Sequence, residues 1–387
     1  MNSLYKKNIV LMLIVLLIAI AIDSRCQTEG EKKDSTSQTT TTHKDSTSKA
    51  DSLKKRVMSF DGYPYAFYTP ETELAVGVGG IFIFYASDSL IAKPSQVVIG
   101  GYYTTNGQYY LSFDPELYFF DNDLFVSMPI NYGYYVNEFF GIGPATPDTG
   151  NVDYSVKTFA GTLSILGPSL WITSDQTGIV FDYNYTQMVD TDSNSYLQND
   201  DVLGSNGGEY LGIGVKSVWD SRDNIFYPTK GKYTSIQFVS YPVGDFIFYT
   251  TEIDVKSYTS LSKNHILAAE VYNENAIGNV PFYALPQLGG QYKMRGYYQG
   301  RYVDNAYFTM QLEYRHYFWW KLGYVVFGSI GTVAPSPDKY QISEMKFSYG
   351  AGLRFLFNEK EGVNLRMDLG ITTEGDTGVY FGIGEAF

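Results

Sequence analysis

The sequence predicts an all-β fold, a transmembrane antiparallel β-barrel, and three observations support this prediction. Apolar and polar residues alternate from Tyr63 to Phe387, aromatic residues make up 17% of the chain, and charged residues make up only 18%. Alternation with a period of two is typical of strands that are apolar on one face only. Abundant aromatic residues fit the interfacial girdles of a barrel in a membrane.

A soluble β-sandwich also shows alternation, and mid-strand charges decide between the two folds. In residues 305–318, Met310 and Leu312 alternate with Gln311 and Glu313, and residues 363–372 follow the same rule. Charged residues in the middle of a strand suit the wet lumen of a barrel and not a packed core. The pattern therefore favours the barrel.

Turn-forming residues divide this region into sixteen predicted strands, an even number, as closed single-chain barrels prefer. The strands are predicted to begin near Tyr63, Glu73, Gln96, Gln108, Leu124, Tyr154, Gly178, Gly208, Lys232, Phe246, His265, Asn305, Leu322, Met345, Val363 and Val379. Short connections alternate with long ones, as periplasmic turns alternate with extracellular loops. Residues 221–231 are an exception, because this connection is long although it is predicted to lie on the inner, periplasmic side.

The first residues predict export. Two lysines precede an apolar stretch of 14 residues, 9–22. A membrane-spanning helix needs about 20 residues, so residues 1–26 are predicted to be a cleaved signal peptide. Ser24 and Cys26 are the small residues before the cut. Lipoprotein processing, with Cys26 as the lipidated residue, is the alternative.

Residues 27–60 are mostly Thr, Ser, Lys and Asp, which predicts a disordered polar periplasmic tether, and residues 61–387 are predicted to form the barrel. Cys26 is the only cysteine, so cleavage after it would leave no disulfide or thiolate chemistry. A net charge of −13 argues against a nucleic-acid partner, which would require a basic surface.

The longest connection within the barrel contains LPQLGGQYKMRGYYQGRY, residues 285–302. Here the sequence resembles the BamA/TamA superfamily, also called the bacterial surface antigen family, whose sixth extracellular loop folds into the lumen. The matching loop motif comprises Gly289, Gly290, Met294, Arg295, Gly296 and Tyr297. Residues 218–233 and 139–149 resemble two further segments of the family, and the resemblance covers essentially all of residues 63–387.

The resemblance implies that Arg295 pairs with an acidic residue on the inner wall of the barrel. The acid of the family pattern is replaced by Ser329 in this chain, so Glu313 and Asp368 are the substitute partners, with Glu313 ranked first. A buried guanidinium needs such a carboxylate to offset its desolvation. The competing interpretation is that Arg295 is hydrated in an extracellular loop.

The resemblance also implies a weak seam between the first and last strands. The closing strand is predicted to run from residue 378 to Phe387 and to include Tyr380 and Phe381, with Glu385 on the outward face. Pro64 weakens the first strand because proline has no N–H to donate. The family's assembly factors carry POTRA domains before the barrel; this chain has only the tether, so it resembles a POTRA-less branch.

Enzymatic chemistry is not expected. The three histidines, His43, His265 and His316, form no recognisable triad with a serine, and residues 328–331 lack the shape of a nucleophile elbow. His265 and His316 are interpreted as interfacial residues. No catalytic residue, metal site or cofactor is predicted.

Three functions remain open for an integral outer-membrane protein whose partners are outer-membrane lipids. The first is assistance in the assembly or translocation of other outer-membrane proteins, with client or accessory proteins as partners. The second is a passive pore or a structural subunit of a larger outer-membrane complex. The third, an outer-membrane enzyme, ranks last. The first depends on family resemblance, and fold alone does not determine function.

Overall fold

The computed structural model describes residues 58–69, 72–87, 92–149, 151–169, 173–192, 197 and 202–387. These residues all belong to one compact unit. The predicted signal peptide, and the predicted tether up to residue 57, lie outside the described residues. No helix in the described part of the chain is long and apolar enough to cross a membrane.

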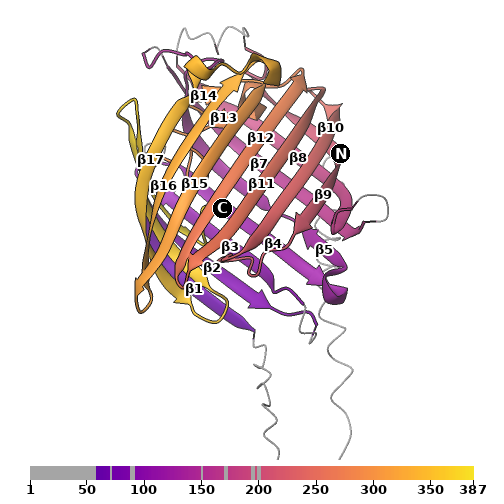
Figure 1. Cartoon of the computed structure of the whole chain (residues 1–387). Coiled ribbons are helices and arrows are strands. Elements are labelled where there is room, and N and C mark those ends of the chain that lie inside the picture. The colour runs from indigo at the N-terminus through magenta and orange to yellow at the C-terminus, as the bar shows by residue number, and fades with distance from the viewer. Residues whose placement is uncertain are drawn as a thin grey trace, which may run out of the picture. The chain divides into compact units, whose positions relative to one another are not determined.

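Seventeen of the described strands form one antiparallel sheet, and β13 pairs separately with β14. Figure 1 shows the sheet curled into a barrel of tilted strands, with β13 and β14 at its upper end. The strands are β1 (Ser59–Thr69), β2 (Glu73–Phe84), β3 (Ser95–Thr104), β4 (Tyr109–Phe119), β5 (Leu124–Ser127), β6 (Ile130–Phe139), β7 (Val152–Pro168), β8 (Gln176–Thr191), β9 (Gly207–Asp220), β10 (Gly231–Gly244), β11 (Phe248–Ser262), β12 (His265–Gly278), β13 (Gln287–Leu288), β14 (Tyr302–Val303), β15 (Ala306–Trp319), β16 (Leu322–Ala334), β17 (Lys346–Asn358), β18 (Val363–Thr372) and β19 (Thr377–Ile383).

Strands β5 and β6 occupy a single position in the sheet. Both pair with β4 on one side and with β7 on the other. They are separated at Met128 and Pro129, where proline removes a ladder donor. Counted as one broken strand, they reduce seventeen strands to sixteen positions.

The strand starts follow the predictions closely. Strands begin at Glu73, Leu124, His265, Leu322 and Val363, as the turn residues predicted. The first strand differs, because it begins at Ser59 instead of Tyr63 and pairs with β2 along its whole length. It therefore includes the last residues of the predicted tether.

The predicted alternation of faces is confirmed on β15. Leu312 is 50% exposed on the outer surface, and its neighbour Glu313 is 0% exposed in the lumen. Part of the lumen is apolar, however, contrary to the predicted wet interior. Buried side chains of β6 to β12 pack there against Phe282 and Leu285, which follow β12. The inward positions of these strands are apolar where a loop covers them.

The two edges of the sheet meet without a ladder. Strands β1 and β19 lie side by side and so close the barrel. Among the strand pairings of the described residues, none joins β1 to β19. β19 has only 7 residues, half the length of β15 with 14.

Candidate functional site

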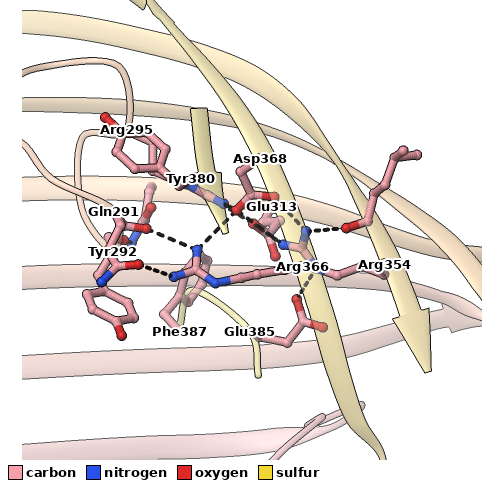
Figure 2. A network of polar contacts seen from close by, with 12 residues as sticks. Gln291, Tyr292, Arg295, Glu313, Arg354, Arg366, Asp368, Tyr380, Glu385 and Phe387 are labelled. Carbon is pink, nitrogen blue, oxygen red and sulfur yellow. Dashed lines mark hydrogen bonds and ion pairs between the residues drawn. The ribbon is translucent and has the colours of Figure 1, made fainter. Parts of the chain in front are cut away.

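Seven charged side chains meet inside the barrel and are called here the charged network: Arg295, Glu313, Arg315, Arg354, Arg366, Asp368 and Glu385. Strand periodicity places five of them, because they occupy inward positions of their strands. These five are Glu313 and Arg315 on β15, Arg354 on β17, and Arg366 and Asp368 on β18. Arg295 and Glu385 reach the network from outside these strands, as Figure 2 shows.

Arg295 enters the network from the segment between β12 and β15, residues 279–305, which is called here the luminal loop. Its Nη1 donates a hydrogen bond to Oδ2 of Asp368 at 2.6 Å, and its Nη2 donates to Oε2 of Glu313 at 2.8 Å (Figure 2). The guanidinium also lies 3.5 Å from the centroid of the Phe327 ring. Arg295 is 0% exposed, so it is not the hydrated loop residue of the competing interpretation.

The other arginines share the same two carboxylates. Arg315 Nε donates to Glu313 Oε1 at 2.8 Å, and Arg354 Nη1 donates to Asp368 Oδ1 at 2.5 Å. Arg366 Nη1 reaches Asp368 Oδ2 at 3.1 Å and also the carbonyl of Gln291 in the luminal loop at 3.0 Å. Asp368 therefore binds three guanidinium groups, which offsets the repulsion between Arg354 and Arg366 on facing positions of β17 and β18.

Ser329 occupies the inward position that the family pattern gives to an acid, but it does not bind Arg295. Its hydroxyl is buried and has no hydrogen-bond partner in the described part of the chain. Nε of Arg295 is likewise buried and unpartnered. Glu313 and Asp368, one on each side of the replaced position, bind the guanidinium instead.

The motif residues around Arg295 attach the luminal loop to the last strands. The Gly296 N–H donates to the hydroxyl of Tyr380 on β19 at 3.0 Å, and the Tyr297 hydroxyl donates to the carbonyl of Phe347 at 3.3 Å. Met294 and Tyr297 are both 0% exposed and belong to one apolar cluster with Leu288. Gly289 and Gly290 have φ of 112° and 98° where the loop turns.

A glycine on β18 makes this attachment possible. A Cβ at Gly370 would lie 2.4 Å from the carbonyl carbon of Arg295 and 2.6 Å from the nitrogen of Gly296. These are backbone atoms, which cannot rotate away as the end of a side chain can. Only glycine lets the luminal loop approach the strand so closely.

The end of the chain corrects the prediction for the closing strand. β19 ends at Ile383, and Gly384 then takes a φ of 78° that turns the chain inward. Glu385 was predicted to face outward, but its side chain is buried and accepts hydrogen bonds from Arg354 Nε and Asn364 Nδ2, both at 2.7 Å. Phe387, predicted to end the strand, is 8% exposed, and its backbone oxygen accepts from Arg315 Nη2 at 2.7 Å. Tyr380 faces inward and Phe381 outward, as strand alternation predicted.

The two other segments that resemble the family also fold towards the lumen. In the β9–β10 turn, residues 221–230, Asn224 Nδ2 donates to the carbonyl of Glu361 at 2.9 Å, and the Tyr227 ring lies 5.3 Å from that of Tyr317. Residues 139–149 contact the luminal loop, where Arg301 Nη1 donates to Thr146 Oγ1 at 3.0 Å. The luminal loop, between β12 and β15, and the β9–β10 turn thus lie at opposite ends of the barrel.

The two histidines of the barrel lie together, which the sequence did not predict. His265 and His316 face each other in register on β12 and β15, and their rings stack at 4.0 Å. Within the described residues, no group of three or more His, Cys, Asp or Glu side chains is placed to hold a metal ion.

Comparisons with known proteins agree with this geometry. The sequence profile described as the Omp85 superfamily domain matches residues 96–387. The structure is similar to BamA from Haemophilus ducreyi lacking POTRA domains 1–3, with a TM-score of 0.56 and 13% identity over 85% of this chain and 70% of that one. It is also similar to CdiB from Acinetobacter baumannii, with a TM-score of 0.51 and 11% identity over 86% of this chain and 66% of that one. No curated protein matches the chain.

Proposed function

The chain belongs to the Omp85 superfamily, and from this premise we propose that its outer-membrane β-barrel assists the assembly or translocation of other outer-membrane proteins. Family membership confirms the resemblance on which the prediction depended. The two similar solved structures share the fold at low sequence identity, so the specific role must be argued from the features of this barrel.

The seam between β1 and β19 is the observation that carries the proposal. The two strands lie side by side, yet no ladder joins them among the described residues. Strand edges without a ladder present N–H and C=O groups that can pair with another chain. Such an edge supports a role in receiving a strand of a client protein.

The luminal loop is attached to the strand that forms one side of this seam. Tyr380 on β19 binds the backbone of Gly296 beside Arg295, and Asp368 on the neighbouring strand β18 binds the guanidinium. A displacement of β19 or β18 at the seam would therefore alter two contacts that hold the luminal loop. This coupling supports a moving seam more than a static wall.

Packing inside the barrel supports the assembly role over a passive pore. The luminal loop places Phe282 and Leu285 against the inner faces of β6 to β12, and Tyr227 reaches Tyr317 from the β9–β10 turn. A general pore needs a continuous water-filled path, as porins have. Filling of the lumen from both ends argues against such a path.

Depletion of the protein, followed by quantification of the outer-membrane proteome, tests the role. Loss of several unrelated β-barrel proteins is expected if the chain assists assembly. An unchanged proteome with altered solute uptake would contradict the proposal and favour the pore. An unchanged proteome with loss of one specific complex would favour a structural subunit.

A crosslink across the seam tests the mechanism separately. Single cysteines on β1 (Gly62 or Ala66) and on β19 (Val379 or Phe381) are combined in a Cys26→Ser background and oxidised. Each single-cysteine protein, treated in the same way, is the control. If the locked seam leaves client assembly intact, opening of the seam is not part of the mechanism.

A further inference from the structure

We propose that a cavity beneath the luminal loop binds a positively charged side chain of the lysine or arginine type, with Glu274 as its principal ligand. This inference goes beyond the assembly role and does not depend on it. It rests on the shape of the cavity, on a pair of facing carboxylates accompanied by a single ammonium group, and on the aromatic groups around them.

The cavity has a volume of about 410 Å³ and lies between the luminal loop and the inner wall formed by β12 and β15. The wall contributes Tyr272, Glu274 and Tyr307, and the loop contributes glutamines and Lys293. A volume of this size accommodates the end of a long side chain with its hydration water, since a water molecule takes about 30 Å³.

Glu274 is opposed by a second carboxylate. Glu252 on β11 is its direct partner in the strand register, and both side chains point into the lumen. The Tyr272 hydroxyl lies 3.0 Å from Glu274 Oε2 and 3.2 Å from Glu252 Oε2. One hydroxyl has one proton, so it donates to only one of these carboxylates at a time. Like charges on facing positions destabilise a sheet unless a cation lies nearby.

The cavity wall already holds one ammonium group of the protein itself. Nζ of Lys293 lies 3.9 Å from the centroid of the Tyr272 ring, which is the geometry of a cation–π contact. Tyr307, 2% exposed, also lines the cavity, and its hydroxyl has no hydrogen-bond partner in the described part of the chain. Aromatic faces, a carboxylate and an unsatisfied hydroxyl together suit an organic cation.

The two carboxylates carry one more charge than the ammonium group of Lys293 can neutralise. Lys293 supplies one positive charge over the Tyr272 ring, whose hydroxyl contacts Glu252 and Glu274, and neither carboxylate takes part in an ion pair among the described residues. Those residues also contain no group of three metal-ligating side chains. The site therefore matches an ammonium or guanidinium group better than a metal ion.

Titration calorimetry of the full chain in detergent tests the proposal. The probes are N-acetyl-lysine amide and N-acetyl-arginine amide, with the uncharged N-acetyl-glutamine amide as the reference. The charged probes are expected to bind and the uncharged one is not. Glu274→Gln is expected to weaken binding about tenfold or more, because a hydrogen bond to a charged group is worth about 1.5–3 kcal/mol. Glu344→Gln, in the short 3-10 helix Ile342–Glu344 and outside the cavity, is the matched control and is expected to change nothing.

For a second variant we expect the opposite change in the affinity for the charged probes. Lys293→Met removes the internal ammonium group, so it should strengthen binding of the charged probes several-fold. Weaker binding by Lys293→Met would overturn the proposal even if Glu274→Gln failed to fold. Equal binding of the glutamine probe, an equal effect of Glu344→Gln, or displacement of the probe by Mg²⁺ beyond the effect of NaCl at the same ionic strength would each overturn it too.

Discussion

Glu385 accepts a hydrogen bond from Nε of Arg354 at 2.7 Å inside the barrel, although continued strand alternation would place its side chain outside. Both side chains are 2% exposed. Arg354 also binds Asp368, which binds Arg295 of the luminal loop. The residues after the last strand and the luminal loop are therefore parts of one charged network.

Replacing Glu385 by Gln should destabilise the barrel. The substitution leaves Arg354 with one carboxylate fewer, and we expect a loss of about 1–3 kcal/mol in the free energy of unfolding, the usual value for a buried polar group that loses its partner. Urea unfolding of the purified protein measures it. Glu359→Gln, an exposed residue on the β17–β18 turn, is the control. Equal stability of the two variants would show that Glu385 does not bind Arg354.

Arg295→Ala should cost more, because it takes one buried guanidinium partner from both Glu313 and Asp368 and also detaches the luminal loop, although the other arginines of the network remain. Breaking a buried ion pair by removing one side typically costs about 3–5 kcal/mol. Arg295→Lys should recover only part of this, since an ammonium group does not reproduce the two directed N–H donors. Thermal loss of the folded form on gels gives the comparison, with the exposed Lys339→Ala as control. Unchanged stability of Arg295→Ala would favour a hydrated loop.

Gly370→Ala tests the close approach of the luminal loop to β18. The new Cβ would overlap the backbone at Arg295 and Gly296, so the loop must move, at a cost of about 1–3 kcal/mol. Gly328→Ala on β16 is the matched control, because the nearest atom to its new Cβ would be 3.9 Å away. Protease digestion of the loop should accelerate only in Gly370→Ala. Identical digestion of both variants would contradict the packing described.

Ser329→Asp restores an acid at the position where the family pattern has one. The charged network has four guanidinium groups and three side-chain carboxylates, with Arg315 also bound to a backbone oxygen of Phe387, and Nε of Arg295 has no partner among the described residues. We expect the added carboxylate to raise the unfolding midpoint, whereas Ser329→Ala should be nearly neutral. A lower midpoint for Ser329→Asp than for Ser329→Ala would show that the network has no need of a further negative charge.

Asp223 in the β9–β10 turn should make stability depend on acid pH. Burial raises the pKa of Asp223, but hydrogen bonds from Thr229 and Lys230 outweigh it and lower the pKa overall. Its stabilisation is thus complete above the unfolded pKa of about 3.9 and is lost as pH falls through the lower folded value. The difference in unfolding free energy between the wild type and Asp223→Asn should shrink below about pH 4. If this difference in unfolding free energy stayed constant below pH 4, titration of Asp223 would not cause the pH dependence.

Most strands could be predicted because their signals are local. Turn residues and two-residue alternation act within a few positions, so starts such as Glu73, His265 and Val363 match the structure. The motif around Arg295 also indicated the right part of the chain. The ranking of Glu313 above Asp368 was only part of the answer, because the structure uses both residues at once.

The features that were missed depend on distant contacts. Alternation continues from Val379 through Phe387, and only the arginines on β15 and β17 reveal why the chain leaves the strand at Gly384. The apolar inner positions of β6 to β12 make sense only when Phe282 of the luminal loop covers them. A single sequence does not show which strands a loop will cover.

The partners of Arg295 also determine when the luminal loop can take its place as the barrel folds. Asp368 follows Arg295 by 73 residues, and Tyr380 follows Gly296 by 84. Glu313 on β15 follows Arg295 by only 18 residues and can bind it first, but the loop must wait for β18 and β19 before its contacts with Asp368 and Tyr380 form. Contacts of such long separation form late. Completion of the last strands and full attachment of the loop are therefore a single final step, and a barrel interrupted before that step would hold Arg295 through Glu313 without Asp368.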